Sequence, residues 1–177
     1  MRAFIGLGGN LGDTHASFAS AVAELRRIGH VVRTSSLYAS APRDMLDQPQ
    51  FSNAAAELET ELSPQELLLE LKRLEMSMGR DPQGMRFGPR VIDLDILSLD
   101  GRCVEDLELD LIVPHPRMHE RRFALEPLAE LAPSLQPWRG CADMRRDVTV
   151  ADLLPSVAEQ DVRRVAGPEW ADPTPLG

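Results

Sequence analysis

The chain has 177 residues, of which 43% are hydrophobic and 5% aromatic, and its formal net charge is −9 at pH 7. This length favours one domain with an aliphatic core, and the negative charge argues against general nucleic-acid binding, which needs a basic surface. No apolar stretch approaches the roughly 18 residues of a membrane span, so we expect a cytoplasmic protein without membrane attachment.

The basic residues and the cysteines narrow the possible chemistry. Of the 19 Lys and Arg residues, only Lys72 is a lysine. Its neighbours rule out a GxxxxGK[ST] phosphate loop, whereas arginine suits bidentate contacts with phosphate. The arginine enrichment fits a GC-rich genome equally well. Cys103 and Cys141 lack CxxC spacing, so we expect reduced structural thiols.

The amino-terminal part predicts a strand, a tight turn and a helix. The strand covers residues 3–8, and the turn is Gly8-Gly9-Asn10-Leu11-Gly12. Leu11 replaces the third glycine of a GxGxxG dinucleotide motif, so we interpret the glycines as a turn. Asp13 is typical of a helix N-cap, and the helix should reach about Ile28. Its apolar stripe contains Phe18, Val22 and Leu25.

Two further strands are predicted over residues 31–38 and 51–62. The loop over residues 40–50 between them is long for a hairpin connection, as functional loops often are. Alternation places Phe51 and Asn53 on one face of the later strand. Asn53 fits either an exposed strand position or an amide that recognises a heterocycle edge above a stacking Phe51.

A second helix and a fourth strand come next. Ser63-Pro64-Gln65-Glu66 is a capping box with proline at the first helical position, and Gly79 stands where the helix should end. The strand is predicted over residues 91–99. Asp100-Gly101 then indicates a type I′ turn, from which a hairpin should return through Val104.

An acid pair on this strand is the main candidate site. Asp93 and Asp95 alternate with aliphatic residues, so both carboxylates share one face, with Cα atoms about 6.5–7 Å apart. They can converge on divalent cations. Arg80, Arg86 and Arg90 precede them closely, and cations beside a metal-binding acid pair suggest a polyphosphate. Alternatively, the arginines only form surface ion pairs with the aspartates.

The remainder of the chain gives weaker signals. We expect a strand over residues 109–113 and a helical segment over residues 121–131 broken by Pro127 and Pro133. A final helix over 149–154 and an edge strand over 162–165 follow. Residues 1–166 therefore form a single domain, and residues 167–177 are a Pro-rich tail that packs little.

His115 and His119 raise the possibility of a metal site of another kind. Their spacing of four would suit two zinc ligands on one helix face. Pro114 and Pro116 flank His115, however, so His115 should precede any helix, and a polar contact between His115 and a ligand is the favoured interpretation.

The predicted element order β-α-β-β-α-β is typical of a ferredoxin-like α+β fold. Such a fold has a mostly antiparallel sheet with both helices on one face. The other face would be free for substrate, with the C-terminal additions arranged around it.

The segment from Arg86 to Leu97 closely resembles the signature of the hydroxymethyldihydropterin pyrophosphokinase family of folate biosynthesis. Further segments match in order over about residues 1–155: Gly8–Gly12, Ser35–Tyr38, Asp47–Ala55, Gly79–Arg80, Val113–His115, Arg121–Phe123 and Pro127–Leu128. The resemblance implies a ferredoxin-like, monomeric enzyme. It would transfer pyrophosphate from ATP to the hydroxymethyl group of 6-hydroxymethyl-7,8-dihydropterin and release AMP.

The resemblance also implies roles for individual positions. Asp93 and Asp95 would bind two Mg²⁺ ions, and Arg80, Arg86 and Arg90 would be catalytic. The ATP-binding positions would be Glu75, Ile96, Leu111, Ile112, His115 and Arg121. The pterin-binding positions would be Ser40, Ala41, Pro42, Arg43, Phe51, Asn53, Phe87 and Phe123.

Some positions depart from the family pattern. Phe87 stands where many members have tryptophan, Pro82 replaces a residue that is basic in some members, and Ala41 and Arg43 alter a common Pro-Pro-Leu stretch. Two other functions stay open: a catalytically altered ferredoxin-like nucleotide- or pterin-binding protein, and a metal-dependent Asp-x-Asp nucleotidyltransferase, which would release pyrophosphate instead of AMP.

Overall fold

The computed structural model describes residues 1–42, 47–81 and 88–172. In chain order the strands and main helices are β1 (Arg2–Gly9), α1 (Thr14–Ile28), β2 (His30–Thr34), β3 (Leu37–Ser40), β4 (Phe51–Glu59), α2 (Pro64–Ser77), β5 (Asp93–Ser98), β6 (Val104–Asp106), β7 (Leu111–Val113), α3 (Arg122–Leu131), α4 (Val150–Leu153) and β8 (Val162–Ala166). No helix in these ranges is long and apolar enough to cross a membrane.

The main sheet is antiparallel throughout and has the strand order β5-β1-β4-β3-β8, with β2 also paired to β4. The prediction of one strand over residues 31–38 is wrong, because β2 and β3 pair with different halves of β4. The interruption falls at Ser36, whose N–H and hydroxyl both donate to the Glu130 carboxylate of α3 (3.0 and 2.8 Å).

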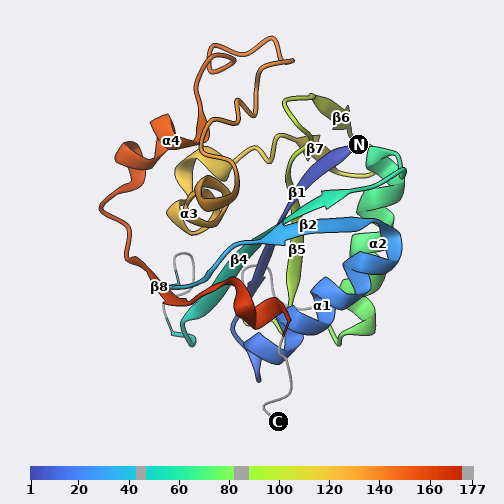
Figure 1. The fold of residues 1–177 in the computed structure, drawn as a ribbon, viewed down its shortest axis with the longest axis vertical. Coiled ribbons are helices and arrows are strands. Elements are labelled where there is room, and N and C mark those ends of the chain that lie inside the picture. The colour runs from blue at the N-terminus through green and yellow to red at the C-terminus, as the bar shows by residue number, and fades with distance from the viewer. Residues whose placement is uncertain (43–46, 82–87, 173–177) are drawn as a thin grey trace.

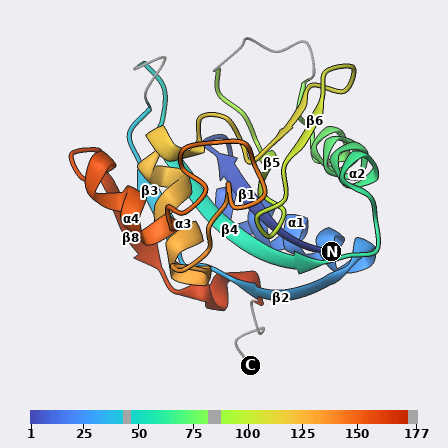
Figure 2. The same cartoon turned by 90° about the horizontal axis from the view of Figure 1, so that it is seen from above.

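Helices cover the two faces of this sheet unequally (Figures 1 and 2). Helices α1 and α2 pack on one face, where Ile5 and Leu7 of β1 belong to the same buried cluster as Phe18 and Leu71. Phe4 points the opposite way, into a second cluster formed mainly by α3 and the segments after it. The predicted fold class and the placement of both helices are therefore confirmed, but α3 covers part of the face that was expected to be free.

The predicted starts of α1 and α2 are confirmed by their caps. The Asp13 carboxylate accepts from the Ala16 N–H (3.0 Å), and Ser63 forms the expected reciprocal capping box with Glu66. Gly79 follows α2 with φ of 93°, a left-handed conformation that glycine adopts at little cost. The conformation of Gly79 thus sets the direction in which the chain leaves α2 toward Arg80.

Two local predictions in the C-terminal half are wrong. Pro127 lies within α3 without breaking it; the burial of Leu125, Leu128 and Leu131 on the sheet offsets the missing hydrogen bond. The turn at Asp100-Gly101 forms with φ of 52° and 78°, but the expected hairpin is reduced to one bridge between Leu99 and Arg102. Strand β6 pairs with β7 instead.

Cys103 and Cys141 form a disulfide with Cα atoms 5.4 Å apart, so the prediction of reduced thiols is wrong. The two residues are 38 positions apart and are brought together by tertiary structure. The Gly140 N–H donates to the Gly101 carbonyl (2.8 Å) beside them. The disulfide therefore connects the turn before β6 to the loop between α3 and α4.

Residues 168–172 also contradict the expectation of a tail that packs little. Trp170 is only 8% exposed, and its indole N–H donates to the Ser35 carbonyl (2.8 Å). Its ring meets Phe18 of α1 edge to face, with centroids 6.0 Å apart. This contact closes the end of the main core beside the break between β2 and β3.

Trp170→Ala should lower the free energy of unfolding by about 3 kcal/mol, because it removes a buried ring and leaves a cavity. Trp170→Phe should cost less, since a ring is kept and the hydrogen bond to Ser35 is lost. Urea unfolding measures both changes. Two variants as stable as the unmodified chain would show that residues 168–172 do not contribute to the folded core.

Candidate active site

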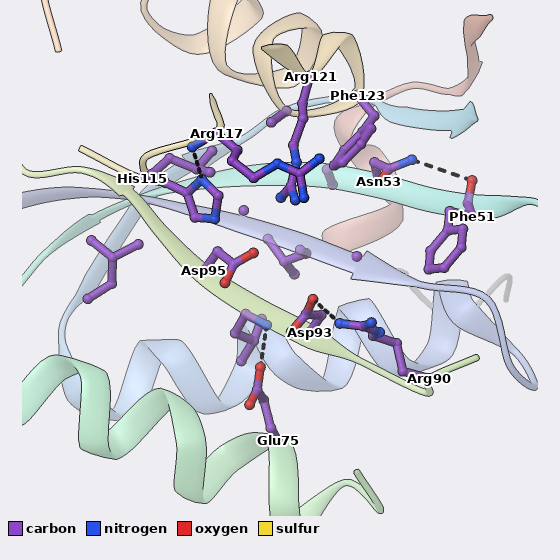
Figure 3. A pocket seen from close by; sticks show the side chains of 18 of the residues that line it. Phe51, Asn53, Glu75, Arg90, Asp93, Asp95, His115, Arg117, Arg121 and Phe123 are labelled. Carbon is purple, nitrogen blue, oxygen red and sulfur yellow. Dashed lines mark hydrogen bonds and ion pairs between the residues drawn. The ribbon is translucent and has the colours of Figure 1, made fainter. Parts of the chain in front are cut away.

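A cavity of about 470 Å³ lies over the sheet between α2, the end of β7 and the start of α3 (Figure 3). Almost all of the predicted site residues line it: Ser40, Ala41, Pro42, Phe51, Asn53, Glu75, Arg80, Arg90, Asp93, Asp95, Ile96, Leu111, Ile112, His115, Arg121 and Phe123. Arg43, Arg86 and Phe87 lie outside the described residues, as does Pro82.

Glycines on β1 make the floor of this cavity. Gly8 is paired across to Asn53 on β4 and to Asp93 on β5, so it lies directly between the two. Adjacent strands are about 4.8 Å apart, which separates Asn53 and Asp93 by about 10 Å. Because Gly8 has no side chain, the space above it is open to both residues. The sequence alone indicated only a turn here.

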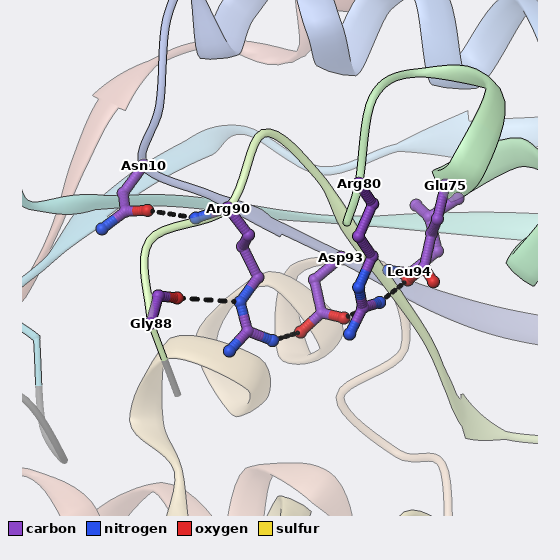
Figure 4. Close-up of polar contacts among 7 residues, drawn as sticks. All are labelled: Asn10, Glu75, Arg80, Gly88, Arg90, Asp93 and Leu94. Carbon is purple, nitrogen blue, oxygen red and sulfur yellow. Dashed lines mark hydrogen bonds and ion pairs between the residues drawn. The ribbon is translucent and has the colours of Figure 1, made fainter. Parts of the chain in front are cut away.

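At one end of the cavity, Asp93 is bonded to two arginines (Figure 4). Its Oδ1 accepts from Arg80 and its Oδ2 from Arg90, each at 2.6 Å. The second arginine is oriented further by a contact from its Nε to the Gly88 carbonyl (3.3 Å). Of the three predicted catalytic arginines, two are thus held side by side by one carboxylate.

Glu75 of α2 contacts both Arg80 and the strand that carries Asp93. Its carboxylate is almost completely buried, accepts from the Leu94 N–H (2.6 Å) and forms an ion pair with Arg80. Burial raises the pKa of Glu75 to about 7 against the effect of the Leu94 hydrogen bond. Leu94 lies between the two aspartates, so Glu75 connects α2 to the acid pair.

Asp95 shares the cavity face of β5 with Asp93 and points toward the side of the cavity that carries His115 and Arg121 (Figure 3). Burial, followed by the charge of Asp93, raises the pKa of Asp95 to about 6. The alternation predicted from the sequence is confirmed, because Ile92, Leu94 and Ile96 are buried in the opposite core. Burial and the neighbouring carboxylate thus disfavour the charged form of Asp95.

His115 faces the same cavity as a neutral side chain. Its backbone N–H donates to the Leu97 carbonyl (3.1 Å), and its Nδ1 accepts from the Arg117 N–H (3.2 Å). Burial and the charge of Arg121 lower the pKa of His115 to about 4. Since Nδ1 is an acceptor in this contact, Nε2 carries the proton and is available as a donor.

The opposite end of the cavity has a different character. Asn53 is 4% exposed, and its amide donates to the Ser40 hydroxyl (2.9 Å) and more weakly to the Phe51 carbonyl (3.4 Å). Phe51 and Phe123 lie near it in the cavity, and the Arg121 guanidinium is 5.6 Å from the Phe123 ring centre. Two rings beside a fixed amide suit a flat, polar-edged heterocycle.

Asn10 was not among the predicted site residues, although it holds the two ends of the cavity together. Its Oδ1 accepts from the Arg90 N–H and its own N–H donates to the Arg90 carbonyl, both at 2.9 Å. Its side-chain amide donates to Gln48 Oε1 (3.1 Å) and the Pro49 carbonyl (3.2 Å). The only signal in the sequence was an asparagine inside a glycine turn.

The donor atoms of the site fit Mg²⁺ and do not fit zinc. Asp93 and Asp95 offer oxygen ligands on one face, and Mg²⁺ commonly takes one or two carboxylates and fills its other positions with phosphate and water. No group of three or more His, Cys, Asp and Glu side chains suited to a metal occurs in the described ranges. His119 packs against Trp138 rather than joining His115, which argues against the zinc alternative.

The comparisons with known proteins agree with this geometry. A family model for 7,8-dihydro-6-hydroxymethylpterin-pyrophosphokinase (HPPK) matches residues 4–133. The chain belongs to the HPPK family. HPPK enzymes are pyrophosphokinases that transfer a pyrophosphoryl group from ATP to hydroxymethyldihydropterin in folate synthesis, so the family expected from the resemblance is confirmed.

Relatives of two lengths are similar to this HPPK chain. The 2-amino-4-hydroxy-6-hydroxymethyldihydropteridine pyrophosphokinase of Bacillus subtilis is 43% identical over 152 residues, which are 85% of this chain and 84% of that protein. A mitochondrial folate synthesis bifunctional protein of Pisum sativum is 46% identical over 128 residues, 72% of this chain but 24% of that protein. The chain therefore spans about a quarter of the bifunctional relative.

Solved structures support the fold. HPPK-DHPS of Plasmodium falciparum superposes with a TM-score of 0.63 at 14% identity, over 92% of this chain and 47% of that chain. At this identity the likeness bears on the fold alone.

Asn10→Ala should speed amide hydrogen exchange at Arg90 by at least about tenfold, because the Arg90 N–H loses its acceptor while strand β5 keeps its own contacts. Exchange at Leu94, whose N–H is bound by Glu75, is the internal control and should change little. Equal acceleration at both amides would instead indicate general destabilisation, and unchanged exchange at Arg90 would show that Asn10 does not hold it.

Proposed function

We propose that this chain transfers the pyrophosphoryl group of ATP to 6-hydroxymethyl-7,8-dihydropterin, with the phosphates at the Asp93 end of the cavity and the pterin at the Asn53 end. The hydroxymethyl oxygen bonds to the β-phosphorus and loses its proton. The bond from that phosphorus to the α–β bridging oxygen breaks, and AMP departs. The observation that carries the proposal is the position of the acid–arginine group. It lies on β5, and only strand β1 separates it from the Asn53 amide on β4.

Asp93 and Asp95 would together hold two Mg²⁺ ions. When bound, the metal neutralises phosphate charge and makes the β-phosphorus a better electrophile. The raised pKa of Asp95 supports a cation site, because a nearby cation would stabilise the ionised form of that buried carboxylate.

Arg80 and Arg90 would stabilise the charge that develops on the transferred phosphate and the departing oxygen. Both side chains are bonded to Asp93, which places them at the proposed phosphate end. Once Asp93 ligates a cation, phosphate oxygens would replace Asp93 as the partner of Arg80 and Arg90. Arg86 would assist in the same way.

The nucleotide would extend from the acid pair toward β7. The backbone around Ile96 and Ile112 would frame the adenine at that end of the cavity, which Leu111 also lines. His115 donates through Nε2, Arg121 adds positive charge, and Glu75 acts on ATP through Arg80 and the Leu94 N–H.

The acceptor would lie between Phe51 and Phe123 with its polar edge on Asn53. Ser40 orders that amide, and the backbone of Ala41, Pro42 and Arg43 would complete the pocket, with Phe87 as an additional wall. By its resemblance to the family, we propose that the enzyme acts as a monomer in the cytoplasm.

The direct test is to incubate the protein with ATP, Mg²⁺ and the hydroxymethyldihydropterin and identify the products. We expect AMP and the dihydropterin pyrophosphate in equal amounts. Release of pyrophosphate would indicate nucleotidyl transfer, and binding of both substrates without any product would indicate a catalytically altered binding protein.

Asp95→Asn should lower kcat by about 10²–10³-fold, because the loss of one metal-ligating charge removes several kcal/mol of transition-state stabilisation. The fold should survive, since Asp95 makes no ion pair in the described ranges. AMP formation and the circular dichroism spectrum are the measurements. Activity within a few-fold of the unmodified protein would contradict the metal assignment.

Arg90→Ala should lower kcat by about 10²-fold while weakening ATP binding much less, because a contact formed mainly in the transition state acts on kcat. Arg27→Ala, which removes an exposed arginine paired with Glu24 on α1, is the matched control and should leave both parameters unchanged. Equal losses in kcat and ATP affinity would assign Arg90 to ground-state binding.

A further inference from the structure

Lys72 lies on the cavity side of α2 and has no role in the function proposed above. Leu68, Lys72 and Glu75 all line the cavity, and their spacing of four and then three residues places them along one face of the helix. With a rise of 1.5 Å per residue, Lys72 stands about 4.5 Å from Glu75 along the helix axis, and Leu68 about 6 Å beyond it.

The two neighbours of Lys72 on this face mark different parts of the cavity. Glu75 is bonded to Arg80 and to the Leu94 N–H, so it marks the acid–arginine end. Leu68 is an apolar lining residue that packs against the main core. A nucleotide with its β- and γ-phosphates beside Asp93 and its base in the apolar end would have its α-phosphate at the level of Lys72.

The ammonium group of Lys72 is also available for such a contact. Arg80 and Arg90 are both bonded to Asp93, whereas Lys72 is exposed and forms no ion pair in the part of the chain that the structure describes. Burial raises the pKa of Glu75 and of Asp95, and the positive charge of Lys72 opposes that shift at both. Its field therefore reaches the phosphate end of the cavity.

We propose that Lys72 binds the α-phosphate of the nucleotide and so holds the phosphate of the departing AMP. This inference rests on the proposed function for the orientation of ATP. Lys72 would act as a positioning residue, because the transferred group is the β,γ-pyrophosphoryl and the α-phosphate stays with the nucleoside. The charge of Lys72 would contribute most to binding of the product AMP. AMP retains only the α-phosphate, so the arginines at the Asp93 end have no β- or γ-phosphate to bind.

The chain offers a matched control for the test. Arg73 is the next residue on α2, carries the same charge, pairs with Glu70 and is absent from the cavity lining. Lys72→Gln should weaken AMP binding by about tenfold and leave adenosine binding unchanged, whereas Arg73→Gln should change neither. Lys72→Arg should restore most of the AMP affinity. Isothermal titration gives all of these affinities.

The possible results separate the alternatives. AMP affinities of Lys72→Gln and Arg73→Gln within twofold of each other would overturn the proposal. An equal loss for AMP and adenosine would overturn it too, because Lys72 would then support the nucleoside rather than the phosphate. If the unmodified protein forms no AMP from its proposed substrates, the proposed function fails, while the comparison of AMP with adenosine still reports on Lys72.

Chemical modification gives a second test that does not depend on a variant. Because Lys72 is the only lysine, acetylation by an amine-reactive reagent at this position can be quantified by mass spectrometry of one peptide. AMP and ATP should protect Lys72, and adenosine at the same occupancy should not. Equal acetylation with and without AMP would contradict the contact.

Discussion

Asp93 accepts hydrogen bonds from Arg80 and Arg90 through its two oxygens, and much of the surrounding structure serves to keep these three side chains in place. Glu75 binds both Arg80 and the backbone of β5, and Asn10 binds the backbone of Arg90. A half-buried carboxylate and two arginines are costly to leave unpaired. In the structure these three side chains stabilise one another. In the proposed reaction a cation would bind Asp93, and phosphate oxygens would bind Arg80 and Arg90.

In the proposed reaction, this arrangement would allow the two substrates to meet on one sheet. Strand β1 lies between the strands that carry Asn53 and Asp93, and Gly8 stands between those residues. Helix α3 covers the remainder of the same sheet face and supplies Phe123 at the border of the cavity. In the proposed binding mode the acceptor oxygen would have a short path to the phosphates. The Asn10 contacts to Gln48 and Arg90 connect the loops on both sides of that path.

Features of the site that depend on local sequence were predictable. The capping box at Ser63 and the glycine at position 79 define α2 and its end, and the period-two alternation around Asp93 and Asp95 determines which way the acids point. The family resemblance then assigned most of the cavity lining.

Features that depend on distant partners were not predictable. Asn10 meets residues 38 to 80 positions away, and Ser36 leaves the sheet because Glu130 of α3 binds its N–H. Trp170 and the Cys103–Cys141 pair were misinterpreted for the same reason. Lys72 had no site role in the sequence-based prediction, and only the fold places its face of α2 beside Glu75 and the acid pair.

In the proposed reaction Asp93 exchanges its two arginines for a metal ion when the nucleotide binds. A structure of the protein with Mg²⁺ and an ATP analogue that has a methylene group in place of the α–β bridging oxygen tests it most directly, because that analogue cannot undergo the transfer. We expect Mg²⁺ bound to Asp93 and Asp95, with Arg80 and Arg90 bonded to phosphate oxygens. Both arginines still bonded to Asp93, with the metal bound elsewhere, would contradict it.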